Sequence, residues 1–343
     1  MQNGNSHNEE GAFCRYKLPG DTHYYVAELG MPSPHMPSVK YFTAQAFDFW
    51  KDPQFLYFPI LEEKKFRITE VGEWPVVSKL GNYTDSRQTK ENFISFVEEA
   101  RNQIALQGFR KVVAARTLFE VYKQNLNWNQ VFCRLAEAYP NSFICMYYSA
   151  RTGCWITATP ELFLQKNGNR IESMSLAGTR KMNESEQEWG AKELDEQALV
   201  STYINEVWKN FGLSNIRAEG PVSLNLQSIQ HLKTVFYADL PEELSIEKLA
   251  AELHPTPAVG GLPKEISLQF IEEKESFKRE MYAGFLGIGE GQNLQTFVQL
   301  RTARIYDNGI LYFAGAGITQ GSDPNKEWVE TENKCKILSA FLY

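Results

Sequence analysis

The chain has 343 residues, of which 43% are hydrophobic and 22% charged, a composition typical of a soluble globular protein with a sizeable core. Its net charge of −7 and the lack of long basic runs argue against a nucleic-acid partner, and no apolar stretch approaches the roughly 20 residues that span a membrane. Five cysteines without Cys-x-x-Cys spacing, and a polar, acidic beginning unlike a signal peptide, predict a cytoplasmic protein with reduced thiols.

The predicted elements alternate irregularly between helices and hairpins. Residues 1–85 carry the weakest pattern, with one expected strand at 54–60. Apolar periodicity and turn signals further along predict strands at 111–117, 142–150, 153–159, 162–165, 170–172, 222–226, 234–237, 285–288, 295–306 and 310–316. The same signals predict helices at 89–106, 127–138, 185–211, 245–253, 264–275 and 325–342. Because strict βαβ alternation is missing, we predict an α+β fold. We expect one domain, in which residues 1–85 supply the N-terminal part of the sheets and residues 86–343 the catalytic region.

Two glutamates occupy unusual positions on predicted helices. Glu196 precedes Leu199, Val200 and Tyr203 by three, four and seven residues, which places it on an apolar stripe, and Glu330 is placed similarly on the last helix. A charged residue is seldom buried unless it is paired or bound to a metal, so an ion pair is the main alternative for each glutamate. Carboxylates with few other protein ligands suit Mg²⁺, which keeps waters and takes oxygens from its substrate.

A lysine and a glutamate lie at predicted strand ends, Lys111 at the start of one strand and Glu161 at the end of another. They can be solvated strand-end charges or an acid–base pair. The second interpretation requires a lowered lysine pKa and a raised glutamate pKa. Arg301, predicted to lie on a strand, can grip a carboxylate through two parallel hydrogen bonds or form an edge salt bridge.

The glycines and histidines give weaker signals. Gly178 and a predicted turn at Gly315-Ala-Gly317 allow backbone N–H groups to approach an anion, although a plain tight turn is the simpler explanation. His231 is more often a structural hydrogen-bonding residue than a catalytic one. The chain's five histidines are too dispersed to form a metal site by themselves.

A series of ordered motifs from about residue 91 to the C-terminus resembles the chorismate-utilising enzymes. The motifs are Lys-Val-Val-Ala-Ala-Arg at 111–116, Ala-Thr-Pro-Glu-Leu-Phe at 158–163, Leu-Ala-Gly-Thr-Arg at 176–180, Asp-Glu-Gln-Ala-Leu-Val at 195–200, His-Pro-Thr-Pro-Ala-Val-Gly-Gly-Leu-Pro-Lys-Glu at 254–265, Gln-Leu-Arg-Thr-Ala-Arg at 299–304, Phe-Ala-Gly-Ala-Gly-Ile at 313–318 and Glu-Trp-Val-Glu-Thr-Glu-Asn-Lys at 327–334. The resemblance implies the fold of anthranilate synthase component I, with two face-packed sheets and helices outside. It also implies chorismate as the small-molecule substrate.

The resemblance also implies a role for individual residues. Lys111 and Glu161 would be catalytic, as the base that activates water and the acid that protonates the leaving hydroxyl. The implied Mg²⁺ site consists of Glu196 and Glu330, with Glu327 acting through water. The implied substrate-binding residues are Gly178, Thr179, His231, Ala258, Arg301, Gly315 and Lys334.

Within the family, the chain is most similar to isochorismate synthases of the menaquinone or siderophore type, which are isomerases, and we lean toward menaquinone. Ammonia-using anthranilate and aminodeoxychorismate synthases usually lack a lysine at the position of Lys111. They also depend on a glutaminase subunit, which we do not expect for this chain. Salicylate synthases keep Lys111 and Glu161 but tend to have threonine at Ala258. The alternative that is not an enzyme is a catalytically silent protein that binds chorismate. One departure from the family is Gln197, where a histidine is common.

Overall fold

A computed structural model describes residues 11–72, 77, 79–84, 89–181, 188–226 and 229–342. Within these ranges the strands are β1 (Ala12–Lys17), β2 (His23–Leu29), β3 (Lys40–Gln45), β4 (Tyr57–Arg67), β5 (Lys111–Val121), β6 (Phe143–Ser149), β7 (Gly153–Thr159), β8 (Leu162–Asn167), β9 (Arg170–Lys181), β10 (Ser214–Leu226), β11 (Ile229–Asp239), β12 (Gly261–Leu262), β13 (Phe285–Glu290), β14 (Asn293–Val298), β15 (Thr302–Ile305) and β16 (Gly309–Ile318). The helices are η1 (Phe47–Lys51), α1 (Lys90–Ala105), α2 (Trp128–Ala138), α3 (Ala191–Phe211), α4 (Ile246–Leu253), α5 (Lys264–Lys274) and α6 (Pro324–Ser339).

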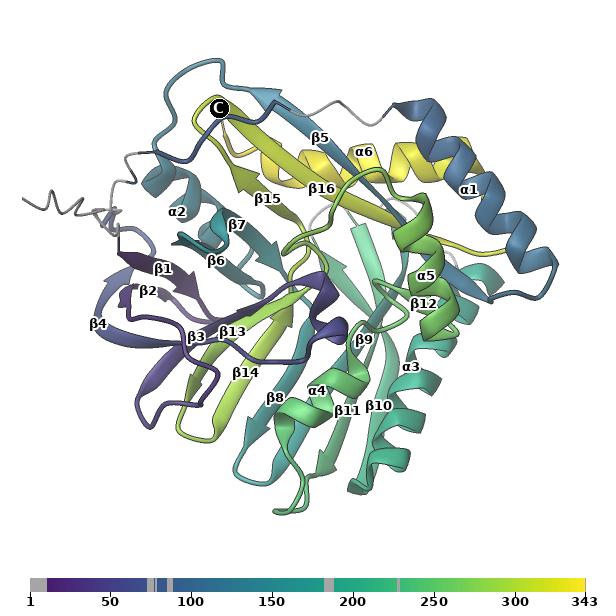
Figure 1. The fold of residues 1–343 in the computed structure, drawn as a ribbon, viewed down its shortest axis with the longest axis horizontal. Coiled ribbons are helices and arrows are strands. Elements are labelled where there is room, and N and C mark those ends of the chain that lie inside the picture. The colour runs from purple at the N-terminus through teal and green to yellow at the C-terminus, as the bar shows by residue number, and fades with distance from the viewer. Residues whose placement is uncertain are drawn as a thin grey trace, which may run out of the picture.

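The strands form two sheets that share strand β4. Hydrogen bonding runs in the order β10-β11-β9-β8-β14-β13-β3-β4-β2-β1-β6-β7-β15-β16-β5-β12, and the neighbouring strands pair antiparallel. The first residues of β4 pair with β3 and the rest with β2, so the ladder continues from one sheet into the other. This arrangement confirms the predicted α+β fold (Figure 1).

Aromatic side chains from the two sheets meet in the core between them. Phe143 on β6 stacks on Phe297 on β14 with ring centroids 4.5 Å apart, and Phe42 on β3 lies 5.2 Å from Tyr147 on β6. Each of these contacts joins strands of different sheets, so the sheets pack face to face as predicted. Large aromatic side chains bury much apolar area each, which makes this contact a major source of stability.

The helices lie on the outer faces of the sheets. Helix α6 runs along β16, and α3 lies against β9 (Figure 1). Helix α1 begins after Thr89, whose hydroxyl accepts a hydrogen bond from the Asn92 amide, as expected of an N-cap. Predicted helix 185–211 begins at Ala191 instead, and its residues 185–187 lie outside the described residues. No helix among the described residues has the length and apolar character needed to cross a membrane.

Strands β1, β2 and β3 were not predicted, and in β1 and β3 burial hides the usual pattern. In β1 and β3, five of six residues are buried, so the side chains on both faces are covered. Alternation between apolar and polar residues appears only where one face meets water. These strands lie in the middle of the strand order, next to β4 and β13. The division of the chain at residue 85 stays a prediction.

The predicted strand at 295–306 is wrong, and so is the placement of Arg301 on it. β14 ends at Val298 and pairs with β8 and β13, whereas β15 begins at Thr302 and pairs with β7 and β16 of the other sheet. The chain therefore changes sheets at residues 299–301. Arg301 has φ +46°, a left-handed conformation outside the extended region that regular strand residues occupy. The sequence pattern remained strand-like across the break because both flanking strands are buried.

The predicted turn at Gly315-Ala-Gly317 is also wrong, since both glycines lie inside strand β16. Glycine is needed at both positions because neighbouring side chains occupy the space that a Cβ atom would take. A Cβ atom on Gly315 would lie 2.7 Å from the Tyr282 hydroxyl, and one on Gly317 would lie 3.1 Å from Cε of Lys111. The glycines therefore let neighbouring side chains approach the strand closely.

Candidate active site

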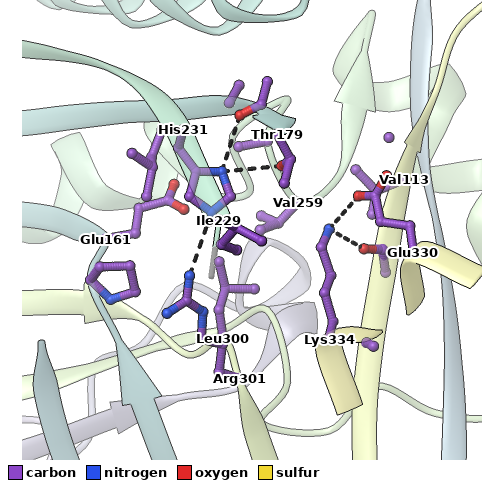
Figure 2. A pocket seen from close by; sticks show the side chains of 18 of the residues that line it. Val113, Glu161, Thr179, Ile229, His231, Val259, Leu300, Arg301, Glu330 and Lys334 are labelled. Carbon is purple, nitrogen blue, oxygen red and sulfur yellow. Dashed lines mark hydrogen bonds and ion pairs between the residues drawn. The ribbon is translucent and has the colours of Figure 1, made fainter. Parts of the chain in front are cut away.

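One cavity gathers every predicted site residue except Glu327. Strands of both sheets and helices α3 and α6 contribute to its walls, and Figure 2 shows Glu161, His231 and Arg301 on one side with Glu330 and Lys334 on the other. The predicted residues that line it are Lys111, Glu161, Gly178, Thr179, Glu196, His231, Ala258, Arg301, Gly315, Glu330 and Lys334. Residues distant in sequence thus meet around a single cavity that is lined by both polar and apolar side chains.

Lys111 and Glu161 are buried ionisable residues without side-chain hydrogen bonds among the described residues. Lys111 starts β5 and is 2% exposed, and Glu161 lies between β7 and β8 and is 3% exposed. Neither side chain makes a hydrogen bond to a residue that the structure describes. Burial lowers the pKa of Lys111, although Glu196 opposes this shift, and burial raises the pKa of Glu161 to about 8. Both groups are therefore shifted toward their neutral forms, as an acid–base pair requires.

Arg301 and His231 form a hydrogen-bonded pair beside Glu161. Nη2 of Arg301 lies 3.4 Å from Nε2 of His231, and Nδ1 of His231 lies 3.0 Å from the Gly178 carbonyl (Figure 2). A guanidinium can only donate, so Nε2 is the acceptor and Nδ1 carries the proton. Burial lowers the pKa of His231 to about 3, so the ring stays neutral. Burial also lowers the pKa of Arg301 to about 10, which leaves it charged and able to bind an anion.

Gly178 and Thr179 reach the cavity through a bulge in strand β9. The register between β9 and β11 shifts between the pairs His231–Thr179 and Leu232–Ala177, and Gly178 has φ +65°. A glycine in this conformation is typical of a bulge, which turns the strand locally and redirects its side chains. The Thr179 hydroxyl lies 3.1 Å from Nδ1 of His231. The bulge therefore brings Gly178 and Thr179 to the wall of the cavity, and their approach to a ligand stays a prediction.

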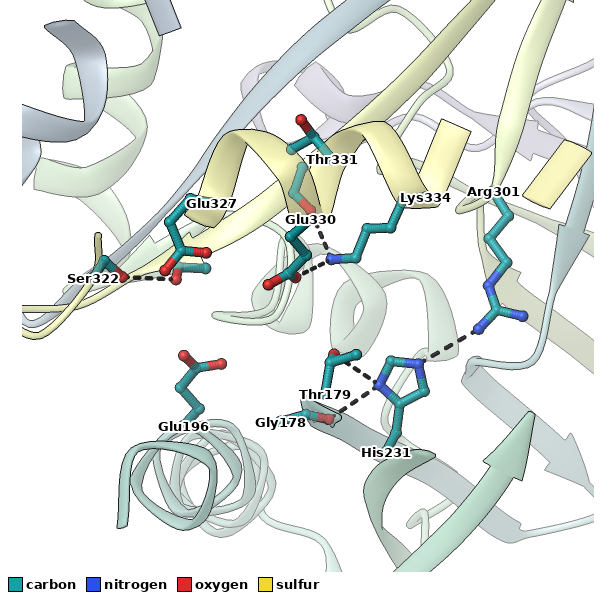
Figure 3. Close-up of polar contacts among 12 residues, drawn as sticks. Gly178, Thr179, Glu196, His231, Arg301, Ser322, Glu327, Glu330, Thr331 and Lys334 are labelled. Carbon is teal, nitrogen blue, oxygen red and sulfur yellow. Dashed lines mark hydrogen bonds and ion pairs between the residues drawn. The ribbon is translucent and has the colours of Figure 1, made fainter. Parts of the chain in front are cut away.

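Three glutamates from two helices point toward one another (Figure 3). Glu196 belongs to α3, and Glu327 and Glu330 belong to α6. Lys334 contacts Glu330 at 2.8 Å and also donates to the Gly315 carbonyl. Burial opposes ionisation of Glu330, yet Lys334 holds its pKa below the ordinary value. Burial raises the pKa of Glu196, and Lys111 opposes that shift.

Glu327 lies just outside the cavity and is connected to it by Lys192. The Lys192 ammonium lies 3.0 Å from Oε1 of Glu327 and 3.9 Å from Oε1 of Glu196. Burial lowers the pKa of Lys192, but the contact with Glu327 outweighs it and the net pKa is raised. Sequence reasoning missed Lys192. The sequence signal for Lys192 is its position four residues before Glu196, which places both side chains on the same face of the helix.

The donor set fits a hard cation that keeps part of its hydration shell. Among the described residues, no group of three or more His, Cys, Asp or Glu side chains is arranged to hold a metal ion alone. Glu196 and Glu330 do line the same space, and carboxylate oxygens are what Mg²⁺ prefers. Mg²⁺ commonly binds through one or two carboxylates together with water and substrate oxygens. The two glutamates therefore fit a site that substrate would complete.

The apolar part of the wall was also missed. Tyr282 lines the cavity next to Gly315, and Val259 lines it beside the predicted Ala258. Arg279, 4% exposed, donates to the carbonyls of Val113 and Val259 and pairs with Glu275, so it ties strand β5 to the loop that carries Ala258. Nothing in the local sequence distinguishes these residues from ordinary core positions, because the cavity forms only when distant segments pack.

Comparisons with known proteins agree with this architecture. A family model for chorismate binding enzymes matches residues 63–343. Isochorismate synthase MenF of Bacillus subtilis strain 168 is 30% identical over 264 residues, 74% of this chain and 56% of that protein. Anthranilate synthase component 1 of Aquifex aeolicus is 29% identical over 279 residues, 77% of this chain and 56% of that protein. The match therefore spans little more than half the length of these relatives.

A solved structure shows the same fold. The menaquinone-specific isochorismate synthase MenF of Escherichia coli superposes with a TM-score of 0.81 at 22% identity, and the superposition covers 97% of this chain and 89% of that one. The family match covers most of the chain, and the fold and the cavity agree with it. The chain belongs to the chorismate-binding enzyme family.

Proposed function

We propose that this protein is an isochorismate synthase, an isomerase that converts chorismate to isochorismate. Water would add at ring C2, the C4 hydroxyl would leave as water, and the double bonds of the ring would shift between these positions. The observation that carries the proposal is the pair Lys111 and Glu161. Both are buried in one cavity without partners among the described residues, and the pKa of each is shifted toward its neutral form.

Each member of the pair has one proton to move. Neutral Lys111 would take a proton from water as the water oxygen bonds to C2, and protonated Glu161 would give its proton to the departing C4 hydroxyl. One proton is taken and one is given, so the net reaction is an isomerisation. Glu161, with a pKa of about 8, holds its proton at neutral pH. Burial shifts the pKa of each group toward its neutral form.

Arg301 and His231 would hold one substrate carboxylate. Arg301 remains charged and has donors beyond the one that faces His231, so a bidentate contact with a carboxylate is available. His231 orients the guanidinium and is itself fixed by the Gly178 carbonyl. Lys334, with Gly315 behind it, would contribute a second positive charge near the ring. The chain's net charge of −7 makes such local cations necessary for binding a dianion.

Mg²⁺ would be held by Glu196 and Glu330, with Glu327 contributing through water. When bound, it would neutralise and polarise the ring carboxylate. The role of this chain's residues is to present carboxylates at one end of the cavity, while Lys192 and Lys334 balance their charge.

The names of the relatives leave sibling reactions open, and two residues favour isochorismate. Lys111 argues against the ammonia users, which usually lack this lysine, so no glutaminase partner is proposed. Ala258, which lines the cavity, argues against salicylate formation, since salicylate synthases tend to have threonine there. A menaquinone pathway and a cytoplasmic location are part of the proposal.

Product analysis tests the proposal directly. Purified protein is incubated with chorismate and Mg²⁺, with and without ammonium, and the products are separated by chromatography. Isochorismate alone, independent of ammonium and lost with a chelator, is the expected result. Salicylate with pyruvate, or an aminated product, would assign the chain to a sibling activity. A folded protein that consumes no chorismate would be a binding protein.

A further inference from the structure

Gln197 is a buried amide whose two ends are both engaged. It is 2% exposed and projects from helix α3 onto strands β9 and β11. Its Oε1 accepts a hydrogen bond from the Ala177 amide at 3.0 Å, and its Nε2 donates to the hydroxyls of Ser175 at 2.8 Å and Thr234 at 3.0 Å. A third acceptor, the Ser175 carbonyl, lies 3.3 Å from Nε2. The side chain therefore points into the sheet and away from the glutamate cluster.

These contacts are made where strand β9 is irregular. The bulge at Gly178 interrupts the ladder between β9 and β11, and a bulge leaves backbone groups beside it without a strand partner. Gln197 satisfies the Ala177 amide on one side of the bulge, and His231 satisfies the Gly178 carbonyl on the other. A buried backbone N–H without a partner would be costly. Gln197 and His231 together hold the bulge in shape.

The same side chain also fixes the direction of its neighbour on the helix. Successive helical residues are rotated by about 100°, so anchoring Gln197 against β9 sets where Glu196 points. We infer that Gln197 is a positioning residue that holds Glu196 in place relative to Gly178 and Thr179. This inference rests on the proposed function, and it assigns Gln197 no contact with substrate or metal. It explains how the Glu196 carboxylate on α3 is held in position relative to the bulge at Gly178 in β9.

The test compares Gln197→Met with Gln197→His. Methionine has a similar length and no hydrogen-bonding group, so it would release the Ala177 amide. Neutral histidine has one acceptor and one donor nitrogen, so it can replace both ends of the amide. We expect Gln197→Met to lower kcat/KM for chorismate about 10- to 100-fold and to raise the Mg²⁺ concentration for half-maximal rate, because partners of ligand residues have effects of this size. Gln197→His should recover most of the loss.

A matched control separates positioning from general stability. Tyr203 is buried on the same helix and donates to the Glu252 carbonyl, so Tyr203→Phe removes one buried hydrogen bond at a distance from Glu196. It should leave kcat/KM and the Mg²⁺ dependence unchanged. If Gln197→Met does not fold, Thr234→Val, a near-isosteric change, removes one of the Nε2 contacts and should shift the Mg²⁺ dependence in the same direction by less.

Three results would overturn the inference: wild-type kinetics in Gln197→Met, no rescue by histidine, or an equal loss in Tyr203→Phe. Deuterium exchange provides a readout that does not depend on activity. The amides of residues 177 and 178 should exchange faster in Gln197→Met than in the wild type and Tyr203→Phe, and equal exchange would contradict the inference. If the wild-type protein makes no isochorismate, the proposed function fails, and the exchange measurement alone decides the role of Gln197.

Discussion

Two pairs of lysine and glutamate in the cavity differ in how closely their members approach each other. Lys111 and Glu161 are 2% and 3% exposed and form no side-chain hydrogen bond to a described residue, and burial shifts the pKa of each toward its neutral form. The Glu330 side chain is 33% exposed, and Lys334 at 2.8 Å holds its pKa below the ordinary value. Burial without a close partner favours the neutral forms, whereas a close partner favours the charged forms.

The largest expected effect comes from removing Lys111 or Glu161. Lys111→Ala and Glu161→Gln should each lower the rate of isochorismate formation about 10²- to 10⁴-fold, the usual contribution of a general acid or base. Product chromatography gives the rate, and thermal unfolding verifies that each variant folds. A wild-type rate in either variant would show that the assignment of acid and base is wrong.

A smaller loss is expected when the anion clamp is weakened. Arg301→Lys keeps the charge but replaces a planar fork with a single ammonium, so a bidentate contact is no longer possible. Hydrogen bonds to charged groups contribute about 1.5–3 kcal/mol, which corresponds to a rise in KM of about 10- to 100-fold. Steady-state kinetics with varied chorismate would detect it. An unchanged KM would remove Arg301 from carboxylate binding.

The proposed metal site is tested by comparing Glu327 and Glu330, which lie one helical turn apart on α6. Glu330→Gln should raise the Mg²⁺ concentration for half-maximal rate about tenfold, since it removes a carboxylate inside the cavity. Glu327→Gln should have a smaller effect, because Glu327 lies outside the cavity and is hydrogen-bonded to Lys192. Rates of isochorismate formation measured over a range of Mg²⁺ concentrations compare the two variants. Equal effects, or none for Glu330→Gln, would contradict this model of the metal site.

The smallest expected effects concern pH. The folded protein holds the Glu161 proton up to about pH 8, whereas an ordinary glutamate releases it near 4.5. The stability from this group is therefore fully present below pH 4.5 and is lost as the pH rises through about 8. Glu161→Gln should be more stable than the wild type above this window, as measured by urea unfolding. In the wild type, kcat/KM should decline above about pH 8 as the acid loses its proton.

Much of the regular structure could be predicted from the sequence. The helix at 89–106 and the hairpins at 142–159 and 162–172 follow local rules, with Thr89 as a cap and Asn167-Gly168 as a turn signal. Strands β1 and β3 could not be found, because burial on both faces removes the alternating pattern. The change of sheet at Arg301 was hidden for the same reason. Local patterns report which side of an element meets water, and a doubly covered strand has no such side.

The sequence by itself determined which residue types are available for the chemistry and in what order they occur. Lys111, Glu161, Glu196 and Glu330 were identified from motifs and from charges on apolar faces. Only the tertiary structure decided that they share one cavity, that Lys192 and Lys334 hold the carboxylates, and that Gln197 turns into the sheet. The physical reason is that protonation and orientation depend on distances between segments far apart in the chain. Those distances exist only after the two sheets have packed together.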